Sequence, residues 1–387
     1  MAPSPAQIDR LLHQAVECHL AGQWEKAEAL YRQILQQQPE HPDASHNLGQ
    51  LWRQRGQPKA AIPLLQVAWR VNPYATQYWL SLVTALAECG EWSLLVQVLA
   101  QACATQLTQE TVTALAELVS QIGDALSCNQ RWTEALVVLE KGVALAPNHP
   151  AIWKSYGIAL HGAGQVQAAQ AAYEKALALN PHCLDAVNNL GVLAMGRRDW
   201  QAALHYFERA LGIAPDHPDV WFNKAMTLKK LQRFQEAETW ARRVLDARSQ
   251  DPRVLRLLGE ILTELRQYSE AREWLEKALG QEPDNWETLQ ALANHYARQE
   301  RWEEAEKWAR KLQDKMPDNP DVLRPLGQIL LKLGREPEGL EILEKVLALK
   351  PDDVETMQAL ADHYARQERW EEAEKWARKL QDKMPDN

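Results

Sequence analysis

Histidine and cysteine are the side chains of this 387-residue sequence best suited to metal binding or nucleophilic catalysis. A tetrahedral zinc site needs four such ligands held together, and the pairs Cys18–His19 and His182–Cys183 stand too far apart in the chain to suggest one. Neither an HExxH nor a GxSxG pattern occurs. We therefore predict no catalytic residue, no metal site and no cofactor, and a protein that is not an enzyme.

The remaining composition argues against nucleotides, nucleic acids and membranes as partners. The glycines of GAGQVQ at 162–167 lack the third glycine of a dinucleotide-binding loop and are better explained as a turn. A net charge of −9 gives no broad attraction to phosphate, and no run of 18 uncharged apolar residues could be inserted into a membrane. Five scattered cysteines and an opening segment unlike a secretory signal lead us to expect a cytoplasmic protein.

The elements that must position any functional side chain follow a 34-residue period, which prolines mark. With each marker proline at position 32 of a 34-residue frame, eleven repeats account for nearly the whole chain. The repeats begin at Ile8, Pro42, Thr76, Ala116, Pro150, Leu184, Pro218, Pro252, Trp286, Pro320 and Val354. Apolar residues at positions 4, 7, 11 and 24, small residues at 8 and 20 and frequent glycine at 15 predict two packed helices joined by a short turn. Most of the 16 tryptophans fall on repeated frame positions, which predicts a packing role.

This pattern resembles the tetratricopeptide repeat family. The segments AIWKSYGIALHGAGQVQAAQAAYEKALALNP and AVNNLGVLAMGRRDWQAALHYFERALGIAP carry the resemblance most fully. It implies an all-α, right-handed superhelical solenoid of about eleven helix-turn-helix repeats, with the first helix of each repeat on the concave side. The segment AEALYRQILQQQPEHPDASHNLGQL also resembles bacterial repeat arrays, related to those of O-GlcNAc-transferase-like proteins, that precede a glycosyltransferase or sulfotransferase domain.

Departures from the period divide the array into three predicted blocks, at residues 1–109, 110–251 and 252–387. Six extra residues at 110–115 predict a longer first helix in the fourth repeat, with Thr108 as its N-cap. The third block consists of two nearly duplicate 68-residue segments, 252–319 and 320–387. Pro325 inside a first helix and Gly339 in place of alanine should each weaken their helices, so we expect the tenth repeat to be a soft spot.

The resemblance also implies a partner-binding surface, because the concave groove of this family receives extended peptides or partner helices through positions 2, 5, 6, 9, 12 and 13 of the repeat. Asn189 and Asn223 share position 6, and an asparagine ladder can hold a peptide backbone by donating and accepting hydrogen bonds. The alternative is that these residues belong to an ordinary solvated face. The predicted partner-binding residues are Asn47, Lys154, Asn188, Asn189, Phe222, Asn223 and Lys230.

Three functions follow as hypotheses. The first is a non-enzymatic protein-protein interaction scaffold. The second is head-to-tail self-assembly into homo-oligomers, in which the last helix docks on the first helix of another copy. That contact would use Ile8, Leu11, Ala15, Ala373, Trp376, Ala377 and Leu380. The third is the repeat portion of a bacterial transferase that lacks its catalytic domain.

Overall fold

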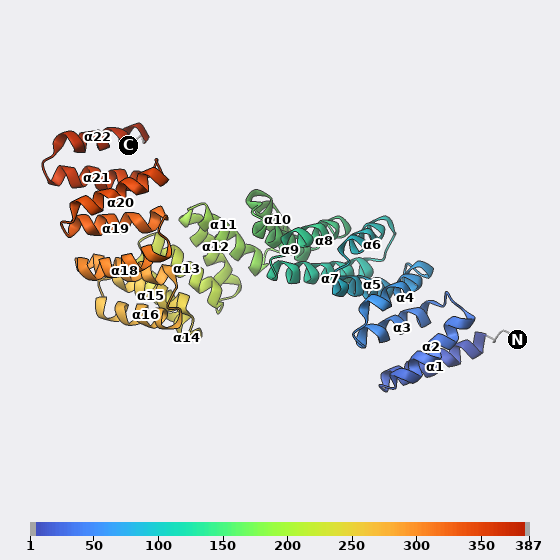
Figure 1. Cartoon of the computed structure of the whole chain (residues 1–387). Helices are drawn as coiled ribbons and strands as arrows, with labels where there is room; N and C mark the ends of the chain where they lie inside the picture. Colours follow the sequence, from blue (N-terminus) through green and yellow to red (C-terminus); the bar gives the residue numbers. More distant parts are fainter. Residues whose placement is uncertain (1–4, 384–387) are drawn as a thin grey trace. The chain divides into compact units, whose positions relative to one another are not determined.

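The computed structural model describes residues 5–383, and within that range it consists of α-helices joined by short turns, without a β-strand (Figure 1). It divides into two compact units, residues 1–197 and 198–387. The first unit contains α1 (Pro5–Leu20), α2 (Trp24–Gln37), α3 (Pro42–Gln54), α4 (Pro58–Val71), α5 (Thr76–Cys89), α6 (Trp92–Ala104), α7 (Gln109–Cys128), α8 (Trp132–Leu145), α9 (Pro150–Gly162), α10 (Val166–Leu179) and α11 (Leu184–Gly196). The predicted block boundaries near residues 109 and 251 remain predictions.

The second unit contains α12 (Trp200–Ile213), α13 (Pro218–Lys230), α14 (Phe234–Ala247), α15 (Pro252–Glu264), α16 (Tyr268–Gln281), α17 (Trp286–Arg298), α18 (Trp302–Lys315), α19 (Pro320–Lys332), α20 (Glu336–Leu349), α21 (Val354–Arg366) and α22 (Trp370–Lys383). Each of α13, α15, α17, α19 and α21 packs antiparallel on the helix that follows it and begins where the 34-residue frame places its repeat. The predicted all-α array of helix-turn-helix repeats is therefore confirmed. No helix in the described range is both long and apolar enough to cross a bilayer.

The longer helix predicted in the fourth repeat is also present. Helix α7 has 20 residues, whereas most first helices of the array have 13 or 14. The Thr108 hydroxyl accepts a hydrogen bond from the Thr111 backbone N–H at 3.2 Å, which satisfies one unpaired donor at the helix start. The six extra residues therefore extend a helix instead of forming a loop.

Position 15 of the frame is the turn between the paired helices, and its backbone is left-handed. Glycine occupies it at five places, with φ between 69° and 77°. The same conformation occurs without glycine, with φ between 56° and 62°, at Gln130, Arg198, Gln232, Arg266, Glu300 and Glu368. This conformation costs a non-glycine residue about 1 kcal/mol. Packing of the paired helices therefore imposes the turn, and glycine relieves its strain where it occurs.

Where glycine occupies position 8, the paired helices approach closely. A Cβ atom on Gly157 would lie 2.6 Å from the ring of Tyr173, and one on Gly259 would lie 2.6 Å from Leu275 Cγ. Both partner side chains are fully buried at position 24 of their repeats. The small residues predicted from the sequence thus mark the sites where the two helices touch.

Tryptophans at position 4 tie the start of a repeat to the preceding turn. The indole Nε1–H groups of Trp79, Trp153 and Trp221 donate to the carbonyl oxygens of Pro73, Pro147 and Pro215, at 2.7, 2.7 and 2.8 Å. Each bond satisfies a backbone acceptor in the turn that follows the previous helix. The structure supports the packing role predicted for these tryptophans.

The predicted soft spot has a structural compensation. Helices α19 and α20 both run their full length, with Pro325 inside α19. A Cβ atom on Gly339 would lie 2.9 Å from Leu331 Cδ2 and 3.0 Å from the Gly327 carbonyl oxygen. In the other duplicated segment these places hold the smaller Thr263 and the larger Ala271. Gly339 therefore makes room for Leu331, and its helix cost is partly offset by packing.

Candidate partner-binding groove

Three successive first helices of the second unit, α13, α15 and α17, enclose a cleft. It comprises two adjoining cavities of about 630 and 210 Å³, which share Lys229, Lys230, Glu260, Gln290, Ala291 and Asn294. Every residue that lines the smaller cavity stands at frame position 2, 5, 6, 9, 12 or 13. We call this surface the α13–α17 cleft.

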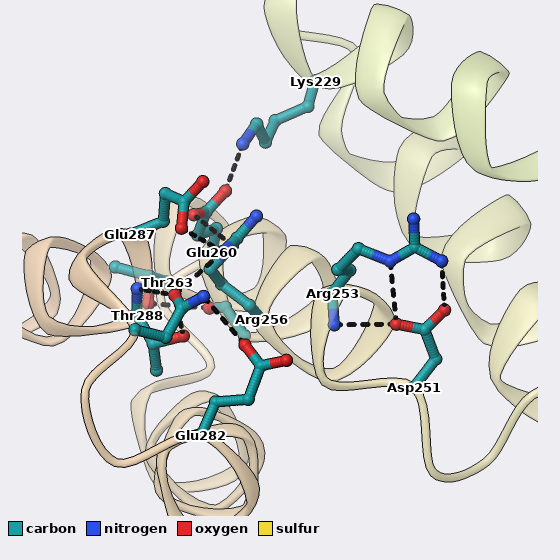
Figure 2. A network of polar contacts seen from close by, with 11 residues as sticks. Lys229, Asp251, Arg253, Arg256, Glu260, Thr263, Glu282, Glu287 and Thr288 are labelled. Atoms are coloured by element: carbon teal, nitrogen blue, oxygen red, sulfur yellow. Dashed lines mark hydrogen bonds and ion pairs between the residues drawn. The ribbon is translucent and has the colours of Figure 1, made fainter. Parts of the chain in front are cut away.

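An ion-pair network crosses the cleft and is drawn in Figure 2. Lys229 of α13 pairs with Glu260 of α15. The Arg256 guanidinium lies 3.8 Å from Glu260 Oε1 and 3.2 Å from Glu287 Oε2 of α17. It also donates to Asn285 Oδ1, the N-cap of α17, at 3.1 Å. The network links the three helices and neutralises two carboxylates inside the cleft.

Positive charge is in excess in this cleft. Five cations line it, Lys229, Lys230, Arg253, Arg256 and Arg298, against the lining carboxylates Glu260, Glu264 and Glu287 and the Asp251 carboxylate that pairs with Arg253. No carboxylate of the described residues lies within ion-pair distance of Lys230. Because the chain as a whole carries a net charge of −9, this local excess marks a surface suited to acidic groups.

Arg253 forms one edge of the cleft. It holds Asp251 through bonds of 3.1 and 2.7 Å, and this contact lowers the pKa of the Asp251 carboxyl despite its partial burial (Figure 2). Its guanidinium also lies 5.9 Å from the ring centroid of Phe222. Phe222, Met226, Leu257 and Ala291 supply the apolar part of the lining. A ligand would therefore meet both an apolar surface and charged edges.

A buried polar contact beneath the cleft joins α15 to α17. The Thr263 hydroxyl donates to the Gly259 carbonyl oxygen at 2.8 Å and lies 2.9 Å from Nδ1 of His295, so its oxygen accepts a hydrogen bond from the Nδ1–H group. The Gln299 amide donates to Nε2 of His295 at 2.8 Å. His295 is 1% exposed, and this burial lowers its pKa from 6.5 to about 4. The imidazole is therefore neutral and serves as a structural link.

The predicted partner-binding residues are divided between the two units. Phe222 and Lys230 line the α13–α17 cleft, and Asn223 lies beside them on α13. Asn189 lies on α11 in the first unit, next to the hydroxyl of buried Tyr173. The asparagine ladder thus involves one residue from each unit and stays a prediction.

The other predicted residues of the first unit already have partners within it. Lys154 pairs with Asp124 at 2.7 Å, and its side chain is 15% exposed. Asn47 Oδ1 lies 3.2 Å from Nδ1 of His46. Asn188 stands beside Asn189 on α11. Binding through Lys154 would require the ion pair with Asp124 to open or to be shared.

The predicted self-association residues differ in exposure. Ile8 and Ala15 are 2% and 0% exposed and belong to the core of α1, α2 and α3, with Leu11 packed against that core. These two residues are therefore not on the surface, because the first repeat uses them for its own packing. On α22, Ala377 is exposed, Trp376 and Leu380 are half-buried and Ala373 is buried.

Sequence reasoning missed Arg256, Glu260 and Glu287, which form the centre of the network. Their frame positions are 5, 9 and 2, all among the groove positions of the family. Applying those positions to every repeat would have found them. What the sequence could not indicate is which of these charges pair with one another.

Comparison with known proteins agrees with this architecture. Family models described as tetratricopeptide repeat match residues 19–93, 194–261, 262–329 and 330–387, and residues 121–181 and 157–218. No curated protein matches the chain in sequence. The fold is similar to that of a chain in the APC/C hetero-tetramer Cut9-Hcn1, with a TM-score of 0.53 and 13% identity over 100% of this chain and 95% of that one.

Two further structures are similar over part of the chain. A tetratricopeptide repeat protein from Parabacteroides merdae has a TM-score of 0.53 and 15% identity, covering 63% of this chain and 97% of its own. PilW, a type IV pilus biogenesis factor, has a TM-score of 0.50 and 20% identity, covering 55% and 98%. At these identities the likeness concerns the fold alone. Since the family models match well over half of its residues, the chain belongs to the tetratricopeptide repeat family.

Proposed function

We propose that this protein is a non-enzymatic scaffold that binds an extended segment of a partner protein in the α13–α17 cleft. The family consists typically of non-catalytic modules that bind proteins. The observation that carries the proposal is the cleft itself, whose lining combines an excess of positive charge with an accessible apolar surface.

Amide side chains in the cleft suit an extended backbone. Gln290 and Asn294 stand one turn apart on α17, and no described residue forms a hydrogen bond with either amide. An amide donates and accepts at once, so it can pair with a peptide group whatever the neighbouring side chain. Lys230 would add a contact to an acidic side chain.

The test is selection from a displayed library of short, unstructured peptides, since extended segments are recognised through their backbone and through pockets for side chains. Binding of the selected peptides is then measured by fluorescence anisotropy with the intact chain and with Lys230→Glu/Gln290→Ala. We expect the double variant to bind about tenfold more weakly, with unchanged helicity. Glu303→Ala, an exposed change on α18, is the matched control. A selection without binders, or equal binding by both proteins, would refute the proposal.

A second candidate function is head-to-tail self-association. It is favoured by a difference in exposure between two helices of the same sequence. Helices α18 and α22 have the same sequence, WEEAEKWARKLQDK. On α18, Ala309 and Leu312 are 2% and 3% exposed, whereas the equivalent Ala377 is exposed and Leu380 half-buried. This face would contact α1 of another copy near Leu11. The predicted relation to bacterial transferases stays a prediction without such an observation.

Light scattering coupled to size exclusion tests this second candidate. If it is right, mass rises with protein concentration above 44.1 kDa, and Trp376→Glu keeps the protein at the mass of one chain. A constant mass at all concentrations, or higher species that persist in the variant, would argue against it.

A further inference from the structure

The two duplicated segments share a core but differ in the surface they present to the groove. Their first helices, α15 and α19, have the same residue at eight of 13 positions. The differences between α15 and α19 are Arg253/Asp321, Leu257/Pro325, Glu260/Gln328, Thr263/Leu331 and Glu264/Lys332. All five stand at groove positions; Leu257 is buried and becomes Pro325, whereas the other buried apolar residues of α15 are unchanged in α19. The duplication therefore kept the scaffold and altered what the groove can recognise.

The altered surface lines a second cavity of about 480 Å³, which we call the α17–α21 cavity. Its apolar lining comes from Trp302, Pro325, Ile329 and Leu331, with small residues of α17 and α21 beside them. Asn294 lines both this cavity and the α13–α17 cleft. The cleft and the cavity therefore adjoin at Asn294.

Replacement of Thr263 by Leu331 makes this part of the groove apolar. In the first copy the Thr263 hydroxyl is used by His295, at 2.9 Å. In the second copy Leu331 is half-buried at the cavity, and Gly339 leaves space for it from below. The two changes fit each other, because alanine at 339 would collide with Leu331.

The second copy has Lys332 where the first copy has Glu264, so this part of the groove carries a positive charge instead of a negative one. In the first copy Arg298 pairs with Glu264 at 3.1 Å. In the second copy Arg366 and Lys332 stand at those places, and both line the cavity. Within the described residues neither has a carboxylate at ion-pair distance; the Lys332 ammonium lies 5.9 Å from the ring of Trp302. Asp362 is the carboxylate of the lining and accepts a hydrogen bond from Gln358 at 3.3 Å.

We propose that the α17–α21 cavity binds an acidic segment of a partner protein, with an apolar side chain against Leu331 and a neighbouring carboxylate between Lys332 and Arg366. This inference rests on the proposed function and specifies its partner. Charge complementarity supports an acidic occupant, since Arg366 lacks the carboxylate that Arg298 has in Glu264, and Lys332, which stands in place of Glu264, has none at ion-pair distance within the described residues. A neutral or basic segment would leave them unpaired or repel them.

Defined peptides test the inference. The probe is a labelled, unstructured peptide of about 12 residues in which one leucine is flanked by glutamates, with three relatives: leucine to serine, glutamates to glutamine and glutamates to lysine. With the intact chain at low salt (about 0.05 M), we expect each relative to bind at least about fivefold more weakly than the acidic, leucine-containing peptide. The difference in affinity between the acidic peptide and the glutamine and lysine peptides should become smaller at high salt.

Variants that give the second copy the residues of the first copy test whether the acidic peptide binds in the α17–α21 cavity. Lys332→Glu should pair with Arg366 as Glu264 pairs with Arg298, so it folds, and it should weaken binding of the acidic peptide about tenfold. Leu331→Thr should remove the preference for leucine over serine. Glu264→Lys gives the first copy the lysine of the second copy, and this variant should bind the acidic peptide at least as tightly as the unaltered chain does.

The outcomes separate the two proposals. If Lys332→Glu and Leu331→Thr bind the acidic peptide as the unaltered chain does, while Lys230→Glu/Gln290→Ala loses its library peptides, this inference is overturned and the proposed function stands. If the unaltered chain binds the lysine peptide as well as the acidic one, the inference is also overturned. If neither the library nor the defined peptides bind, both proposals fail.

Discussion

Replacing His295 by glutamine should remove a pH dependence from the stability of the second unit. His295 is 1% exposed on α17, and its neutral ring is held by the Thr263 hydroxyl at Nδ1 and the Gln299 amide at Nε2. A second proton on Nε2 would meet the hydrogens of that amide. Burial, with smaller contributions from Arg301 and Arg272, lowers the His295 pKa to about 4.

The direction and the size of the pH effect on stability follow from this lowered pKa. Between pH 6.5 and about 4 the unfolded chain binds a proton at residue 295 and the folded chain does not, so stability falls as the pH falls through this window. One pKa unit corresponds to about 1.4 kcal/mol, so the loss contributed by His295 reaches about 3 kcal/mol near pH 4. Glutamine keeps hydrogen-bonding capacity without titrating. The variant should be about 1 kcal/mol less stable at pH 7 yet lose less stability on acidification.

Two measurements test this reasoning. Proton and carbon NMR of the histidine rings should show one resonance, absent from His295→Gln, that does not titrate above about pH 5. Hydrogen exchange of α15 to α17, corrected for the intrinsic rate at each pH, should show local opening that acid favours in the unaltered chain and favours less in the variant. Hydrogen exchange is used because it reports the opening of these helices directly.

His363→Gln is the matched control, since His363 is the equivalent residue of the second copy and its nearby sequence differs only in Asp362, where the first copy has Asn294. Its side chain is 13% exposed, and its Nε2 lies 3.5 Å from a carboxylate oxygen of Glu336. We expect no comparable loss of acid sensitivity in this variant. A His295 resonance that titrates near 6.5, or equal acid sensitivity of the unaltered chain and His295→Gln, would refute the account of this site.

Three further substitutions, Gly339→Ala, Asp353→Asn and Trp79→Phe, should each lower the stability of the protein. Gly339→Ala should lower stability by about 1–3 kcal/mol in thermal unfolding, and adding Leu331→Thr should recover part of the loss; additive effects would contradict the proposed fit. Asp353, 3% exposed, is held by Arg324 at 2.9 Å. Burial raises its pKa, but hydrogen bonds from Thr356, Lys350 and Arg324 outweigh this and lower it overall, so its contribution to stability is present at neutral pH and lost in strong acid. Asp353→Asn should therefore cost about 3 kcal/mol in urea unfolding at pH 7 and much less near pH 2, and an equal cost at both would argue against the ion pair. Trp79→Phe should cost about 2 kcal/mol in the same assay at pH 7, because it removes the bond to the Pro73 carbonyl and leaves a cavity, and an unchanged midpoint would show that the bond is dispensable.

Much of the fold could be predicted from the sequence, because its determinants are local. Pro150 at a helix start, Thr108 as an N-cap and glycine opposite a large side chain each act within one repeat or between two paired helices. The period then places every other helix. The left-handed turns without glycine, such as Glu300, were not predicted, because the packing of the helix pair and not the turn residue imposes them.

The groove was predicted only in outline. The frame positions of its residues follow from the sequence, and Phe222 and Lys230 were identified in this way. The pairing of Arg256 with Glu260 and Glu287 depends on three helices that meet side by side, so no single repeat contains the information. The same holds for Lys154, which the structure pairs with Asp124 of another helix.

The duplicated helices distinguish most clearly what the local sequence determines from what the tertiary structure determines. Helices α18 and α22 have the same sequence and the same secondary structure, so the sequence by itself determined that both are amphipathic helices. Leu312 is buried under α19, whereas the equivalent Leu380 remains half-exposed. His295 and His363 likewise share their local sequence but differ in partners. Burial, charge pairing and the character of each cavity depend on the neighbouring helix, which only the tertiary structure brings into contact.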